Sequence, residues 1–418
     1  MSQDGGTRED NRTKVLRTIW EAGEVSRASL SRKIGLAPST VGSIVQDLLD
    51  QGLIVISHVA RSKGGRPPVV LRFATDRFAF LGVDLGASHV RIALMDAAGK
   101  LLRSDRMAYP VEEDPHGTLD LVDRLLSASM ASAFKMDRIV VGVGLSVPSP
   151  LDPKNPDELS ARILPAWEGV PVLSRVRGFS GLPVWIDNDA NVGALAEYWW
   201  GAGQRSGDMA YIKVATGVGA GLVIDGRLFR GSAGIAGEIG HTAIDPRGPK
   251  CRCGLNGCLE AMIGSGSLTR EVRARLDDDS PSVLARVEPT PAAIAMAARA
   301  DDAVAREVLA EAGAYLGTAV ANLVNLLNPA RVVLGGSLPV LADDLLLRPM
   351  EKTLAQRTLG RSFAATEVVV SELKEAAVVT GAATQVLEAC LADPSLFAGR
   401  PDSRPHFNHP AVALPGGA

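Results

Sequence analysis

The first 75 residues carry an alternation of apolar and polar positions that predicts three helices. In residues 11–22, apolar side chains recur every three or four positions, the spacing of one helix face. Residues 27–34 repeat this pattern, and Ser26 stands where a side chain can cap the helix. The third pattern begins at Pro38, a favourable first-turn residue, and its apolar face comprises Val41, Ile44, Val45, Leu48 and Leu49. The chain therefore opens with a predicted three-helix unit.

Two apolar segments follow these helices and flank a basic, glycine-rich stretch. The segments, residues 53–56 and 69–73, are predicted to be strands. Three helices with such a wing are typical of a winged helix-turn-helix, whose third helix enters the major groove of DNA. The residues predicted to contact DNA are Ser39, Thr40 and Ser43 on that helix and Arg61, Lys63 and Arg66 in the wing. The alternative is a three-helix domain whose basic loop is only solvated.

Beyond residue 76, apolar strands alternate with amphipathic helices, which indicates an α/β body. Several strands run directly into polar or glycine-rich junctions: Asp84 to Ser88, Asp187 to Asn191, the turn Ala215 to Gly221, and Gly335 to Ser337. The predicted elements around them include helices 118–134 and 192–200 and strands 139–145 and 222–224. Because α/β folds bind ligands at strand ends, and glycine turns can cradle a phosphate, the junctions indicate a two-lobed, nucleotide-type cleft. Taken singly, each glycine turn is equally well explained as a turn.

The charge distribution separates the head from the body. The 418 residues have a formal net charge of -3, but residues 1–74 hold 11 Lys and Arg against 7 Asp and Glu. A basic head on an acidic body predicts that the head meets a polyanion. The start of the chain has no apolar signal core, and the apolar stretch 308–327 is interrupted by Glu311, Asn322 and Asn325, so neither secretion nor a membrane span is expected. We expect a cytoplasmic protein, with a disordered tail over residues 393–418, which are rich in Pro, Gly and Ala.

Three of the four cysteines lie within eight residues, close to a histidine. Cys251, Cys253 and Cys258 follow His241, and glycines among them let the loop turn tightly. Thiolates and an imidazole are the ligands of a tetrahedral structural zinc site, which the spacing predicts here. The alternative is a group of buried, reduced cysteines without metal. Two carboxylates, Glu238 and Glu260, stand at the ends of this stretch.

These motifs together resemble those of the ROK family of sugar kinases and sugar-responsive repressors. The segment 84–88 is similar to its first phosphate motif, 188–191 to its catalytic motif, 216–219 to its second phosphate motif and 334–336 to its adenosine motif. The segments 237–241 and 251–260 are similar to its two signatures, and the resemblance covers residues 11 to about 390. It implies an actin-like, hexokinase-type two-lobed fold behind the winged helix-turn-helix. The expected parts are 1–75 (winged helix-turn-helix), 76–190 (first lobe), 191–392 (second lobe, its last helix packing back on the first) and 393–418 (tail).

The resemblance also implies roles for individual residues. Asp189 would be the base that activates a sugar hydroxyl if the protein is a kinase. Sugar hydroxyls would be bound by Asn188, Asp189, Glu238, His241 and Glu260, with His241 also on the zinc. Phosphate or nucleotide would be bound by Asp84, Gly86, Ser88, Thr216, Gly217, Gly219, Gly335 and Gly336. Polyols need several acceptors, which carboxylates and amides supply, so the residue types agree with this assignment independently.

Two functions follow, and they differ in what the cleft does. The favoured one is a DNA-binding transcriptional regulator, with repression favoured over activation, that senses a sugar or sugar phosphate. It would act on a double-stranded operator as a homodimer or homotetramer. The alternative is an ATP- and Mg-dependent sugar kinase with a fused DNA-binding head. The chain has Ala87–Ser88 where the family's kinases favour Gly-Thr, and Ala215 where they often carry Gly, while Asp189 is intact.

Overall fold

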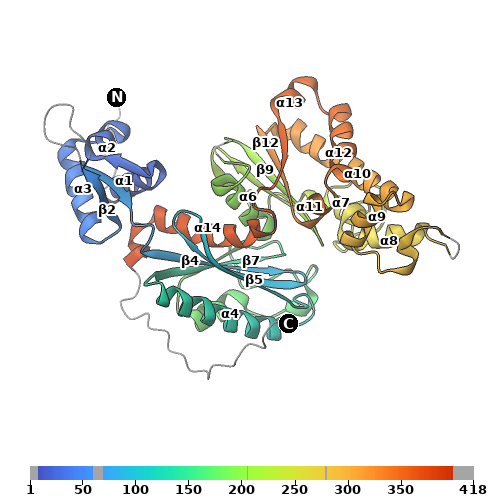
Figure 1. The fold of residues 1–418 in the computed structure, drawn as a ribbon, viewed down its shortest axis with the longest axis horizontal. Helices are drawn as coiled ribbons and strands as arrows, with labels where there is room; N and C mark the ends of the chain where they lie inside the picture. Colours follow the sequence, from blue (N-terminus) through green and yellow to red (C-terminus); the bar gives the residue numbers. More distant parts are fainter. Residues whose placement is uncertain (1–7, 60–68, 205, 278–279, 399–418) are drawn as a thin grey trace.

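The structure is a computed structural model that describes residues 8–59, 69–204, 206–277 and 280–398. A small helical head and two larger lobes, each built on a five-stranded sheet, follow one another along the chain (Figure 1). The predicted α/β class, with a winged helix-turn-helix before two actin-like lobes, is confirmed.

The head is a three-helix unit closed by a small sheet. Its helices are α1 (Arg8–Ala22), α2 (Arg27–Ile34) and α3 (Pro38–Asp50), and its strands are β1 (Glu24–Ser26), β2 (Ile54–Val59) and β3 (Val69–Phe73) in the order β1-β3-β2. Ser26 caps α2 as predicted, because its hydroxyl accepts a hydrogen bond from the Ser29 amide at 3.2 Å. The short strand β1 was not predicted, since three residues carry too little pattern to be recognised.

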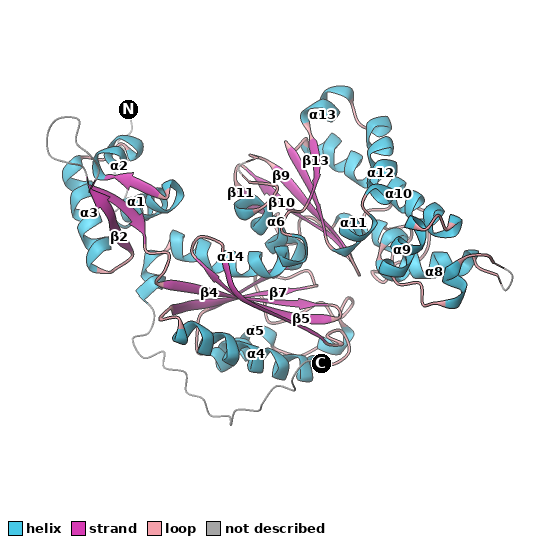
Figure 2. Ribbon diagram, viewed as in Figure 1, coloured by secondary structure: helices cyan, strands magenta, loops and turns pink. Residues whose placement is uncertain are grey.

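The first lobe contains a sheet of order β6-β5-β4-β7-β8, covered by helices on both faces (Figure 2). Its elements are β4 (Phe78–Gly86), β5 (His89–Asp96), β6 (Leu101–Ala108), α4 (Pro115–Lys135), β7 (Ile139–Val147), α5 (Val172–Ser180) and β8 (Val184–Asn188). Helices α4 and α5 cover one face. Strand β4 is buried along its whole length, which explains its unbroken apolar sequence.

The second lobe repeats the strand order of the first, as β11-β10-β9-β12-β13. Its elements are α6 (Asp189–Trp200), β9 (Met209–Val214), β10 (Val218–Ile224), β11 (Arg227–Phe229), α7 (Leu259–Ile263), α8 (Ser265–Arg275), α9 (Pro291–Arg299), α10 (Ala303–Leu327), β12 (Arg331–Gly335), α11 (Ser337–Ala342), α12 (Asp344–Arg357), α13 (Gly360–Ala365) and β13 (Glu367–Val370). In both lobes an antiparallel three-strand meander continues into two parallel strands.

The last helix, α14 (Ala377–Ala392), returns to the first lobe and covers the other face of its sheet. It also packs along α6, so these two helices lie between the lobes. The contact is close because Gly381 has no side chain: a Cβ there would lie 1.7 Å from the Val192 carbonyl oxygen. Any larger residue at 381 would push the helices apart.

The core of the head continues into the body. Phe73 of β3 and Phe78 of β4 both stack against Phe397, with ring centroids 5.5 and 4.9 Å apart. Phe397 belongs to a short 3-10 helix, Pro394–Ala398, and is 3% exposed. The prediction of a disordered tail from residue 393 is therefore wrong for its first six residues, because one buried aromatic side chain outweighs the composition rich in Pro, Gly and Ala that follows it. Residues 399–418 of that predicted tail lie outside the described residues.

Among the helices that the structure describes, none combines the length and apolar character needed to cross a bilayer.

Candidate functional site

The predicted ligand residues gather in one cleft between the lobes. The first lobe contributes Asp84, Gly86, Ser88 and Asn188, and the second contributes Asp189, Thr216, Gly217, Gly219, Glu238, His241, Glu260 and Gly336. Gly335 does not line the cleft: it is the last residue of β12, and a Cβ there would lie 2.3 Å from the Tyr211 ring. The cleft thus unites predicted ligand residues that are up to 252 positions apart in the sequence, from Asp84 to Gly336.

Helix α6 begins inside this cleft, earlier than predicted. We expected it from Val192, but Asn188 is its N-cap and Asp189 its first residue. The Asn188 side-chain oxygen accepts a hydrogen bond from the Ala190 amide at 2.9 Å, and its amide donates to the Ser149 carbonyl at 3.3 Å. The motif's Asn therefore has a capping role that the prediction overlooked. One N–H and one lone pair of its amide are left for a ligand.

Asp189 is paired with a lysine that the sequence analysis missed. The Lys213 ammonium lies 2.5 Å from Asp189 Oδ2, and both side chains are largely buried. Burial opposes the charge of Lys213, but the carboxylates of Asp189 and Asp84 outweigh it and raise the pKa of Lys213 above its usual range. A lone Lys at an inward position of an apolar strand, Met209–Val214, was the signal that could have identified it.

The two carboxylates beside the cysteines, Glu238 and Glu260, both line the cleft but have different surroundings. Glu260 is held on both oxygens: Oε1 accepts from Arg252 Nε at 2.9 Å and Oε2 from the Val218 amide at 3.0 Å. Burial, together with the charges of Asp189 and Glu260, raises the pKa of Glu238 to about 7. Arg252, which lies between two cysteines in sequence, was not predicted to belong to the site. It neutralises part of the acidic cluster and orients Glu260.

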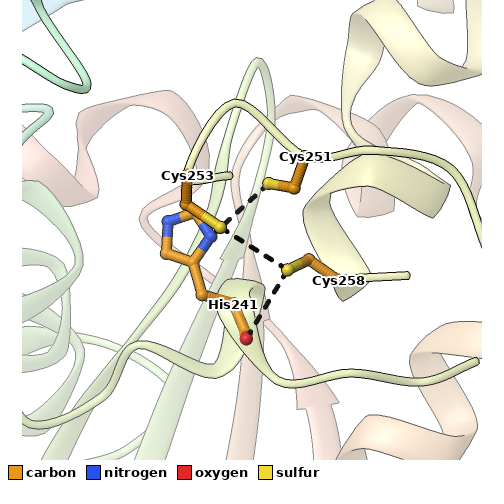
Figure 3. A group of neighbouring side chains, drawn as sticks. All are labelled: His241, Cys251, Cys253 and Cys258. Atoms are coloured by element: carbon orange, nitrogen blue, oxygen red, sulfur yellow. Dashed lines mark hydrogen bonds between the residues drawn. The ribbon is translucent and has the colours of Figure 1, made fainter. Parts of the chain in front are cut away.

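His241, Cys251, Cys253 and Cys258 form a compact cluster (Figure 3). Their ligand atoms all lie within 4.8 Å of one another, with Cys253 Sγ 3.7 Å from Cys258 Sγ and Cys251 Sγ 3.7 Å from His241 Nδ1. Two sulfurs bound to a tetrahedral zinc at about 2.3 Å lie about 3.8 Å apart. The donor set and its spacing therefore fit zinc. The other imidazole nitrogen, His241 Nε2, points toward Glu238 at 3.9 Å.

The glycine turns differ in detail from their prediction. The first is a tight turn, Ala87–Ser88, between β4 and β5, as expected. The second was predicted over Ala215 to Gly221, but only residues 215–217 turn, and Val218 already begins β10. That strand contains alternating glycines, which a sequence pattern cannot separate from a loop. Gly336 starts the third turn with φ of +85°, a conformation that favours glycine.

A further ion pair joins the lobes beside the cleft and was also not predicted. Arg230 Nε and Nη2 both donate to Asp187 Oδ2, at 2.9 and 2.7 Å, while Asp187 Oδ1 accepts from the Asn191 side-chain amide. Asp187 is the residue before the last of β8 in the first lobe, whereas Arg230 follows β11 in the second. This ion pair holds the segment that leads into α6 against the second lobe.

The predicted DNA-binding residues are partly described. Ser39, Thr40 and Ser43 are exposed on α3, opposite its buried apolar face. Arg61, Lys63 and Arg66 of the wing lie outside the described residues. The described part of the head thus presents the hydroxyl face that was expected to meet DNA.

Comparison with known proteins agrees with this architecture. The model of the ROK family matches residues 80–389, and a winged helix-turn-helix DNA-binding model matches residues 8–55. A xylose repressor of Caldicellulosiruptor bescii is 34% identical over 388 residues, which span 92% of this chain and 97% of the repressor.

Two solved structures resemble the whole chain and its body, respectively. A ROK family transcriptional regulator, a homologue of the E. coli MLC protein, superposes with a TM-score of 0.80 at 29% identity, over 93% of this chain and 98% of that one. A ROK glucokinase from Streptomyces griseus, solved with glucose and AMPPNP, gives a TM-score of 0.65 at 29% identity, over 73% of this chain and 98% of the kinase.

Proposed function

The chain belongs to the ROK family and carries a winged helix-turn-helix DNA-binding domain in front of the ROK domain, and from this premise we propose that it is a transcriptional repressor that releases its operator when a sugar enters the cleft. The repressors among its relatives, which align with the head as well as the body, support this proposal. The effector would be a sugar or sugar phosphate, and the protein would act in the cytoplasm as a homodimer or homotetramer on a palindromic operator.

The observation that carries the proposal is the course of helix α6. Its first residue, Asp189, lines the cleft, while its last two, Trp199 and Trp200, contact Trp20 of the head. The centroid of the Trp20 ring lies 5.1 Å from that of Trp199 and 5.9 Å from that of Trp200, and both pairs meet edge to face. A ligand that pulls on the start of a rigid helix displaces its far end as well. Helix α6 thus connects the cleft, at its first residue, with the DNA-binding head, at its last two residues.

In the cleft, the acidic side chains would receive the sugar. Glu238, with its raised pKa, and Asp189 present carboxylate oxygens toward the same space as the Asn188 amide. Zinc bound by the His-Cys cluster would supply a rigid tetrahedral crosslink for the loop that carries Glu238 and Glu260. Sugar binding would draw the lobes together around α6 and α14, and the head would then leave its operator geometry.

The decisive experiment is operator release. A labelled operator, identified by selecting DNA bound to the full-length protein, is followed by fluorescence anisotropy while candidate sugars and sugar phosphates are added. We expect one of them to weaken operator binding by about 5- to 150-fold, the usual range of allosteric coupling. Asp189→Asn should bind the operator normally but need at least about tenfold more effector, because it loses one charge-assisted bond. An operator that stays fully bound throughout the screen would contradict the sensor function.

Kinase activity is the second candidate, supported by the Asp189 carboxylate in a cleft like that of the glucokinase solved with glucose and AMPPNP. A coupled ADP-release assay with ATP, Mg²⁺ and each hexose compares the wild type with Asp189→Ala. From the pairing of Asp189 with Lys213, we expect no turnover above the Asp189→Ala background. Turnover that disappears with Asp189 would establish the kinase, alone or beside the sensor.

A further inference from the structure

Lys213 lines the cleft beside Asp189, the residue that would act as the base in a kinase. It is the fifth residue of β9, and Met209 and Tyr211, which share its face of the strand, are buried in the cluster that contains Ala194 of α6. The alternation of the strand directs Lys213 toward the start of α6. Its ammonium bonds Asp189 Oδ2 at 2.5 Å, and its side chain is 20% exposed.

The first lobe brings a second carboxylate to the same cleft. Asp84, at the end of β4, is 4% exposed and lies 3.4 Å from His89 Nε2. Its charge acts on Lys213 across the cleft and helps to raise the pKa of that lysine. Lys213 therefore pairs with Asp189 and shares the cleft lining with Asp84, one carboxylate from each lobe.

The Lys213 ammonium disfavours a divalent ion beside Asp189. Mg²⁺ is held in proteins by one or two carboxylates together with several water molecules and substrate phosphates, in a strict octahedron. Here one oxygen of Asp189 is already occupied by Lys213, and the ammonium would repel a second cation brought near it. The Lys213 ammonium already supplies a positive charge at this position, so no metal ion is needed there to balance Asp189.

We infer that the ammonium of Lys213 is a built-in cation that replaces the divalent ion between Asp84 and Asp189, so that the cleft binds its sugar without metal or nucleotide. The inference rests on the proposed sensor function, which it deepens: it explains how a cleft with the family's phosphate turns can serve recognition alone. Lys213 is then a positioning residue. It fixes Asp189 so that its second oxygen faces the sugar, and it disperses the repulsion among the carboxylates of the cleft.

The test replaces Lys213 and measures metal binding directly, with Mn²⁺ as the probe. Zinc-loaded, full-length protein is titrated with Mn²⁺, whose electron paramagnetic resonance signal falls on binding. We expect Lys213→Ala to bind one Mn²⁺ per chain at least about tenfold more tightly than the wild type, because the ammonium that repels a divalent ion is removed from a cleft lined by Asp84 and Asp189. Lys213→Arg keeps the charge and should behave like the wild type. Adding Asp189→Asn to Lys213→Ala should abolish the gained site, which locates it.

The outcomes separate this inference from the proposed function. Equal Mn²⁺ binding by the wild type and Lys213→Ala would overturn the inference, as would tight binding by the wild type that Asp189→Asn removes. Neither result depends on the operator or the sugar, so the sensor function stands or falls on the release experiment alone. If Lys213→Ala does not fold, judged by thermal unfolding, Lys213→Gln tests the same loss of charge with a side chain of similar length.

Discussion

Replacing Cys251 by Ser is expected to abolish zinc binding and to lower the stability of the second lobe. A serine hydroxyl is a poor zinc ligand at neutral pH, and structural zinc contributes apparent free energies of about 10–16 kcal/mol in small zinc domains. Cys251 Sγ lies 3.7 Å from His241 Nδ1, so its loss opens the cluster next to Glu238. We expect bound zinc to fall from about one equivalent to below about 0.1, with sugar affinity reduced about 10- to 100-fold as support for the carboxylates is lost.

Metal analysis of the purified protein, thermal unfolding and sugar titration measure these effects. Cys390→Ala is the matched control, because Cys390 is the fourth cysteine, buried in α14 and outside the cluster. It should keep a full equivalent of zinc and lose only packing in the core. Less than half an equivalent in the wild type, together with an equally stable Cys251→Ser, would refute the zinc site.

Trp20→Ala is expected to uncouple operator binding by the head from sugar binding in the cleft. The indole of Trp20 contacts Trp199 and Trp200 at the end of α6, and its N–H donates to the Ala97 carbonyl at 2.7 Å. Truncation removes the aromatic contact between α6 and α1, so that the Arg17 guanidinium over the Trp199 ring is what remains of their described ring contacts, and it leaves the exposed face of α3 untouched. We expect operator affinity within about threefold of the wild type. The effector should then release the operator at least about tenfold less effectively, because the coupling free energy is lost.

Operator anisotropy and direct sugar titration, done on the same protein, distinguish lost coupling from lost binding. Trp20→Phe is the control, since it keeps an aromatic ring between α1 and α6 and loses only the hydrogen bond to Ala97. It should retain most of the response. A Trp20→Ala protein that releases its operator at wild-type effector concentrations would show that the signal travels elsewhere, for example through the Phe397 contact.

Hydrophobic periodicity was sufficient for most of the elements. Helix α2 and strand β3 have the bounds that the pattern predicted, because each has an apolar side and clear turn or capping signals at its ends. The predicted bounds were wrong where one residue belongs to two elements or where a strand contains glycines. Asn188 ends a strand and caps a helix, and the glycines after Val218 belong to a strand although they resemble a turn.

The candidate site was predictable in its composition but not in its pairing. Motif residues such as Glu238 and Cys258 are recognisable by type and spacing. Lys213 was missed although its inward position in an apolar strand was a signal, and Arg252 and Arg230 were missed because a single basic residue in a loop has no pattern of its own. Their importance lies in which carboxylates they meet, and those partners are 24, 8 and 43 positions away.

By itself, the sequence determined the family, the winged head, the two-lobed body and the His-Cys cluster, because these depend on local spacing and on residue type. Only the tertiary structure decided that Lys213 bonds Asp189, that Arg252 bonds Glu260, and that α6 reaches from the cleft to Trp20. The physical reason is that charge compensation and coupling depend on distances of a few ångströms between separate elements. Those distances are set by how the sheets and helices pack, which no local pattern records.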